Sequence, residues 1–144
     1  GTAITFGGIP SGIKLIYVIL DGVSGSGTDN MQLDLGDAGG LETSGYQTAT
    51  QVINTDDTVV GGSSTGTIDF RYTAASDVMY GIVTLALMDS TNNQWACNYM
   101  LRLTTAELLI GASSKSLSDT LTQLSLGWAA SATFDAGSIN IMYQ

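Results

Sequence analysis

The chain has 144 residues, a net charge of −9, and 44% hydrophobic against only 12% charged residues, which excludes a disordered tail and indicates one domain with a core of its own. Binding to nucleic acid or to an anionic membrane needs clustered basic side chains, whereas Lys14, Arg71, Arg102 and Lys115 are scattered singly. The longest apolar run, residues 15–20, is far too short to span a bilayer. The scattered basic residues and the short apolar runs together indicate neither nucleic-acid binding nor membrane insertion.

Short apolar segments alternate with clusters of Gly, Ser, Thr, Asn and Asp, a pattern typical of an all-β sandwich. The clearest alternation lies in 67–73, where Ile68, Phe70 and Tyr72 share one face. Pro10 is expected to fix a turn before the first long strand. In chain order, strands are expected over 15–20, 31–35, 67–73, 78–88, 94–102, 120–126 and 138–141, with turns or loops at 36–40, 60–64 and 89–93, and a bulge at Gln123.

One segment also has a helical signal. Residues 104–107 (TTAE), before an apolar run, fit a capping box, so a helical turn remains open there. Gly111 and the serine-rich residues 113–116 leave little room for a stable helix. We therefore expect a loop followed by a strand over 120–126 rather than a stable helix.

Two strands are apolar on both faces, which is unusual for an antiparallel sheet with one face in water. Residues 15–20 (LIYVIL) hold one phenol, and 82–88 (IVTLALM) hold one hydroxyl. The second face must be covered, either by long loops of the same chain or by another copy. Because few residues are left to form a covering layer, we predict a tight homo-oligomer that contacts through Leu15, Tyr17, Ile19, Val83, Leu85 and Leu87.

The absence of histidine removes most catalytic schemes: no Ser-His-Asp triad, Cys-His dyad, His-ligated zinc or imidazole base can form. Residues 62–66 (GSSTG) match a nucleophile elbow, but Ser64 has no base to take its proton. One catalytic scheme remains possible, in which a pair of carboxylates cleaves a glycosidic bond. The sequence signal for such a pair has almost no specificity. We expect no enzyme activity and no cofactor.

Several segments resemble the C-terminal domains of bacteriophage tail fibres and tailspikes. The closing segment is the most specific of them, and the matching segments run from one end of the chain to the other. They are 6–14 (FGGIPSGIK), 21–24 (DGVS), 35–37 (LGD), 42–46 (ETSGY), 115–121 (KSLSDTL) and 134–143 (FDAGSINIMY).

The resemblance implies an antiparallel jelly-roll sandwich, similar to tumour necrosis factor, that assembles as a homotrimer. It also implies that residues 1–144 form a single receptor-binding domain, the C-terminal part of a longer fibrous protein. Such a domain belongs to the phage tail in the virion, is made in the bacterial cytoplasm, and attaches to a polysaccharide or lipopolysaccharide of the host. A tail-needle knob fits the same description.

Sugar recognition needs a flat aromatic face with amides or carboxylates beside it. Trp128, between two expected strands, is a candidate, and so is Tyr46; each can equally pack within the protein. Asn92 and Asn93 at a hairpin tip are further candidates, or simply turn formers. Asp56 and Asp57 are weak candidates for a metal site in what reads as a solvated loop.

Three functions stay open. The first is attachment of the virion to a host surface glycan. The second is a domain that only trimerises and caps the fibre, with recognition elsewhere. The third, a module that cleaves polysaccharide, depends on carboxylates alone.

Overall fold

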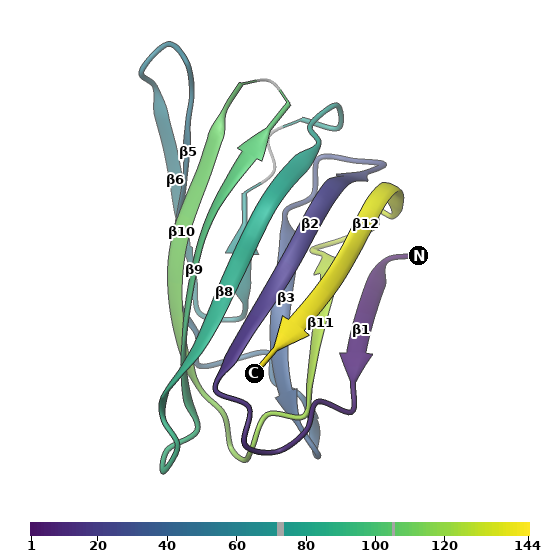
Figure 1. The fold of residues 1–144 in the computed structure, drawn as a ribbon. Coiled ribbons are helices and arrows are strands. Elements are labelled where there is room, and N and C mark those ends of the chain that lie inside the picture. Colours follow the sequence, from purple (N-terminus) through teal and green to yellow (C-terminus); the bar gives the residue numbers. More distant parts are fainter. Residues whose placement is uncertain (72–73, 105) are drawn as a thin grey trace.

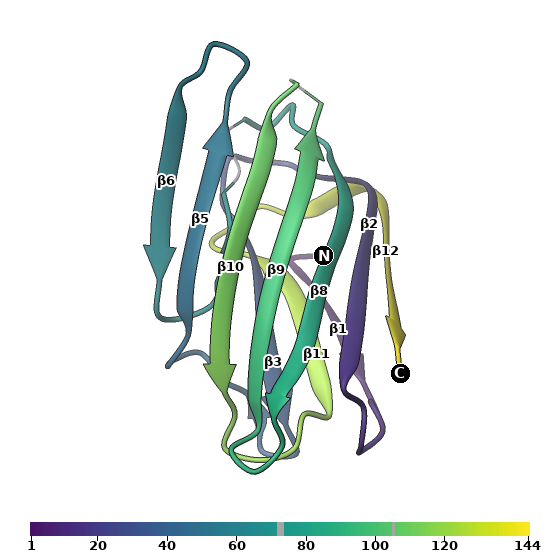
Figure 2. The same cartoon turned by 60° about the vertical axis from the view of Figure 1, so that its left-hand side comes forward.

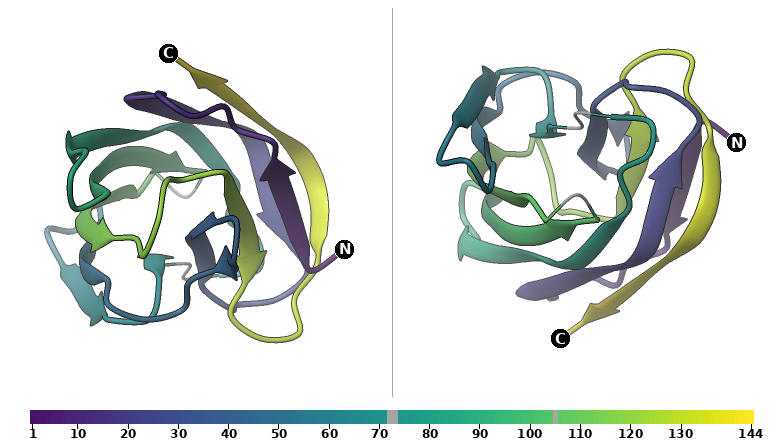
Figure 3. Two further views of the ribbon diagram at one scale, coloured as in Figure 1. Left: turned by 90° about the horizontal axis from the view of Figure 1, so that it is seen from below. Right: turned by 90° about the horizontal axis from the view of Figure 1, so that it is seen from above.

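The computed structural model describes residues 1–71, 74–104 and 106–144, and within them the chain forms two antiparallel β-sheets with no helix, hence none that could cross a membrane. The all-β prediction is confirmed. Seen end-on, the two sheets face each other and enclose the interior (Figure 3).

The smaller sheet has the strand order β1-β11-β3-β4, and β7 also pairs with β3. The larger sheet has the order β12-β2-β8-β9-β10-β5-β6 (Figures 1 and 2). The strands of the smaller sheet are β1 (Ala3–Gly7), β3 (Met31–Asp37), β4 (Gly40–Leu41), β7 (Ile68–Phe70) and β11 (Gln123–Trp128). Those of the larger are β2 (Leu15–Gly25), β5 (Gln47–Ile53), β6 (Val59–Ser64), β8 (Met79–Asp89), β9 (Gln94–Leu103), β10 (Leu108–Ser116) and β12 (Phe134–Tyr143).

The core is built by alternate residues of the strands that face inward. Ile16, Val18 and Leu20 of β2 are 2% exposed or less, and burial of each such side chain stabilises the fold by roughly 1.5–3 kcal/mol. In the middle of the sandwich the rings of Phe70 and Tyr99 lie 4.6 Å apart in a tilted contact that joins the two sheets.

Most expected strands are present, and the hairpin at 89–93 joins β8 to β9 as predicted. Three details were wrong. Residues 60–64 are not a loop, because β6 pairs with β5 from Val59 to Ser64. No bulge is found at Gln123, which is the first residue of β11 and pairs in regular register with β3. The apolar run after the capping-box sequence was expected to lie in a loop and instead forms β10.

Two expectations fall partly outside the described residues. Of the strand expected at 67–73, the structure gives β7 (Ile68–Phe70), while Tyr72 and Thr73 are not described. Thr105 of the capping-box sequence is also outside the described residues.

Candidate functional site

Trp128 is not a loop residue. It is the last residue of β11, 6% exposed, and its indole packs on the ring of Phe134 with centroids 5.3 Å apart. Gly25 lies against the indole so closely that a Cβ there would stand 2.4 Å from a ring carbon. The prediction of a binding residue at a loop tip is therefore wrong, because β11 turns this side chain into the core.

Tyr46 is also buried, at 0% exposure. Its hydroxyl accepts the backbone N–H of Leu35 at 2.7 Å and donates to the backbone oxygen of Glu42 at 2.9 Å. Burial raises the pKa of this phenol well above its usual range. Tyr46 therefore holds the turn after β4 against β3 and offers no surface to a sugar.

Around Tyr46 lies a polar network that joins distant parts of the chain. Lys115 of β10 is 5% exposed and forms an ion pair with Glu42, and its ammonium stands 5.5 Å from the centre of the Tyr46 ring. The backbone N–H of Ser118 donates to Glu42 Oε1 at 2.7 Å, and the Ser118 hydroxyl donates to Asp37 Oδ2 at 2.6 Å. The network thus connects 35–46 with 115–118.

The network also sets the protonation of its two acids. The hydrogen bonds from Ser118 and from the Gly39 N–H lower the pKa of Asp37. Burial raises the pKa of Glu42, but the hydrogen bonds from Lys115 and Ser118 outweigh it, so this pKa is also lowered. Both carboxylates are therefore ionised and occupied by partners at neutral pH, which suits a structural role.

A second link joins β2 to β12. The Ser24 hydroxyl donates to Asp135 Oδ1, and the register between the two strands shifts beside it. Gly22 and Gly137 both have left-handed backbone angles there, with φ of 67° and 88°. A Cβ at Gly137 would stand 2.2 Å from the backbone oxygen of Gly22, so the close approach of the two strands requires glycine.

Asn92 and Asn93 shape the β8–β9 hairpin. The Asn92 amide donates to Asp89 Oδ2 at 2.7 Å, and Asn93 has a left-handed φ of 47°. Asn93 also lines a small hollow of about 150 Å³ at the end of the sandwich where three loops meet (the lower end in Figure 1), which we call the end hollow. Its other polar and aromatic lining residues include Lys14, Ser90, Trp95 and Thr120.

Asp56 and Asp57 lie in the β5–β6 hairpin. The carboxylate of Asp56 accepts the Thr58 hydroxyl at 2.5 Å and the Thr58 N–H at 3.1 Å, and Asp57 takes a left-handed φ of 67°. These are turn interactions. Over the described part of the chain, no three acids or cysteines are grouped as a metal site would need.

The predicted contact residues divide between two faces. Leu15, Tyr17 and Ile19 are half-buried on the outer face of the larger sheet. Val83 and Leu85 are completely buried in the core of the single chain, because they pair with the inward-facing Val18 and Ile16. The prediction is therefore wrong for these two residues, which cannot contact another copy.

Leu87, the remaining predicted contact residue, is half-buried, packs against the core and borders the end hollow. The residues of β8 that do face outward include Ile82, at 49% exposure. The choice of face was therefore wrong for β8, and the contact between copies stays a prediction.

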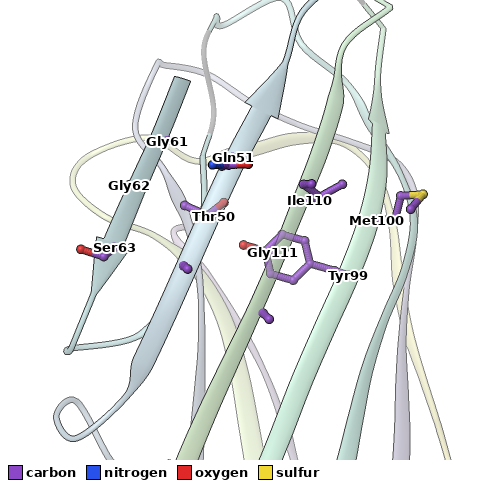
Figure 4. Close-up of a pocket in the computed structure, with 11 residues that line it drawn as sticks. Thr50, Gln51, Gly61, Gly62, Ser63, Tyr99, Met100, Ile110 and Gly111 are labelled. Carbon is purple, nitrogen blue, oxygen red and sulfur yellow. The ribbon is translucent and has the colours of Figure 1, made fainter. Parts of the chain in front are cut away.

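A second and larger hollow, of about 780 Å³, lies on the outer face of the larger sheet over β5, β6, β9 and β10 (Figure 4). Small residues make its floor, among them Ala49, Gly61, Gly111 and Ala112. We call it the sheet hollow. Sequence reasoning missed it, since it arises where four strands place small residues side by side.

Comparison of this chain with protein-family models, curated proteins and solved structures gives no match.

Proposed function

We propose that this chain is the receptor-binding domain of a bacteriophage tail fibre or tailspike, which attaches, as a jelly-roll trimer, to a glycan of the host surface. The observation that carries the proposal is the way the resembling segments meet in space. Glu42 and Asp37 contact Lys115 and Ser118, and Ser24 contacts Asp135. Segments far apart in the sequence thus form one framework, which supports a fold shared with that family.

The end hollow is the place where we propose that the glycan binds. Asn93, Ser90 and Thr120 supply an amide and two hydroxyls, the groups that pair with sugar hydroxyls. Lys14 adds a cation, which favours an acidic sugar. Three weak sites on one rigid trimer would bind a repeating polysaccharide much more tightly than one site does.

Binding of the fluorescently labelled domain to host cells and to their purified polysaccharide tests the proposal. Saturable binding is expected, weakened at least tenfold by Ser90→Ala combined with Thr120→Val. Ser131→Ala, at an exposed position outside the end hollow, is the matched control and should bind like the wild type. Absence of binding to every susceptible host would refute the proposed function.

The second candidate is a domain that only trimerises and caps the fibre. The burial of Trp128 and Tyr46 favours it, because neither ring offers a face to a sugar. In that case the isolated domain would assemble but bind no glycan, and deletion of the domain from the fibre would abolish assembly.

A further inference from the structure

The two sheets differ in what they present to solvent. On the smaller sheet the outward positions are mostly polar: Thr5, Ser125 and Asp34 lie side by side across three strands, and Gln32 faces Asp69. Thr5 and Ser125 share a hydrogen bond of 2.9 Å. The outward side chains of this sheet are therefore polar, as on the solvent side of an antiparallel sheet, although Ser125 itself is only 6% exposed.

The larger sheet has the opposite character on its outer face. Its pairing places four large apolar side chains in one row across β2, β8, β9 and β10, and Met100 is 66% exposed. We call this row the ridge. The ridge consists of Ile19, Ile82, Met100 and Ile110.

The same face is almost free of net charge. In the row beside the ridge, Asp21, Tyr80 and Arg102 lie on neighbouring strands, and the Arg102 guanidinium stands 5.4 Å from the centre of the Tyr80 ring. One acid and one base therefore share this row, on a chain whose net charge is −9. Two copies that meet here avoid most of their mutual repulsion, and Asp21 of one can pair with Arg102 of the other.

The size of the face fits contact with other copies of this chain. Seven strands spaced by about 4.8 Å, over about seven residues of roughly 3.3 Å rise, give a flat footprint of roughly 600 Å². Side-chain relief raises the accessible area above this value. A stable contact buries about 800 Å² on each partner, so this face has the extent that contacts with other copies need.

Ridge and sheet hollow are also complementary in shape. The sheet hollow begins where the ridge ends, at Met100 and Ile110, and extends to Gly61 and Gly62 of β6 (Figure 4). Ala112 and Ala49 also line it. Exposed apolar side chains and a hollow with a small-residue floor thus lie next to each other on one surface. In a symmetric assembly each copy offers its ridge and receives another's.

We infer that the outer face of the larger sheet is a contact between copies of this chain, in which the ridge of one copy seats in the sheet hollow of another. The inference rests on the proposed function only for the expected number of three copies. The contact itself follows from the outward residues, their charge and their shape.

The mass of the protein in solution tests whether copies associate through the outer face of the larger sheet. Light scattering at micromolar concentration should give a multiple of the single-chain mass for the wild type, and the single-chain mass for Met100→Lys and for Ala112→Lys. Both positions are exposed, so neither change disturbs the core. Ala3→Lys adds the same charge to the outer face of the smaller sheet and should leave the wild-type mass unchanged.

A cross-link tests the seating of the ridge. Ile82 and Ala112 lie on β8 and β10, two strands and therefore at least about 9.6 Å apart in one chain, which is too far for a disulfide within the chain. The variant Ile82→Cys/Ala112→Cys should therefore form covalent multimers on oxidation, while each single variant should form far fewer. An assembled protein that gives no cross-link would overturn the seating.

A wild type of single-chain mass, or face variants that keep the wild-type mass, would overturn the contact. Host binding is read separately on the wild type. Self-association without host binding refutes the receptor function and leaves the contact standing. Host binding by a single-chain species refutes the contact and the trimer but leaves the receptor function standing.

Discussion

The ion pair of Lys115 and Glu42 allows a prediction that depends on which partner is removed. Glu42→Gln leaves the Lys115 ammonium, 5% exposed, with the backbone oxygen of Ser116 at 2.7 Å and the face of Tyr46. Lys115→Met instead leaves Glu42, 22% exposed, with both donors of Ser118. The first change leaves a buried cation without its charge partner, whereas the second leaves a hydrated and hydrogen-bonded anion.

The magnitudes follow from that difference. Breaking a buried pair from one side costs about 3–5 kcal/mol when the remaining charge is uncompensated. We expect about 3 kcal/mol for Glu42→Gln and about 1–2 kcal/mol for Lys115→Met, whose partner keeps its other hydrogen bonds. At this chain length these losses correspond to melting temperatures lower by roughly 10 °C and 5 °C.

Urea unfolding followed by the fluorescence of the buried Trp95 and Trp128 measures these losses. All variants are compared at one protein concentration, because association adds to apparent stability. The double variant Glu42→Gln/Lys115→Met should be no less stable than Glu42→Gln alone. The reasoning is refuted if Lys115→Met destabilises the protein as much as Glu42→Gln does.

Gly25→Ala should cost about 1–3 kcal/mol by thermal melting, because its Cβ would stand 2.4 Å from a ring carbon of Trp128; an unchanged melting temperature would contradict this. Asp37 and Glu42 have lowered pKa values in the folded state, so their stabilisation is present above about pH 4 and is lost below it. Equal midpoints of urea unfolding at pH 6 and pH 3 would contradict this loss of stabilisation in acid. Burial raises the pKa of Cys97 to about 12, so a thiol reagent should react only on unfolding; rapid labelling of the folded protein would show otherwise.

The strands were predictable because alternation of apolar and polar residues is local information. Residues 31–35 of β3 alternate between apolar and polar, and so the sequence alone indicates which of these side chains face the core. The inward set of β8 was not predictable, because Ile82 and Val83 are equally apolar. Their orientation is decided by pairing with β2, a long-range property.

The candidate site was harder to predict for the same reason. Trp128 follows a glycine and precedes two alanines, a context that suggests a loop, yet its pairing with Met31 extends β11 by one residue and turns the indole inward. Val59–Ser64 holds two glycines and still forms a strand, since its backbone pairs with β5. The end hollow and the sheet hollow each bring together residues from several elements, and no local pattern records that.

The pairing of β2 with β12 has a consequence for how the chain folds. β2 (Leu15–Gly25) meets its outer neighbour only after Phe134–Tyr143 has left the ribosome, and the Phe134 N–H bonds to the oxygen of Gly1 as that strand begins. Until then one side of an apolar strand has unsatisfied backbone groups that can recruit the wrong strand. Synthesis and folding are therefore coupled at β12. Nascent chains that stall before β12 has emerged should be the species most prone to aggregate.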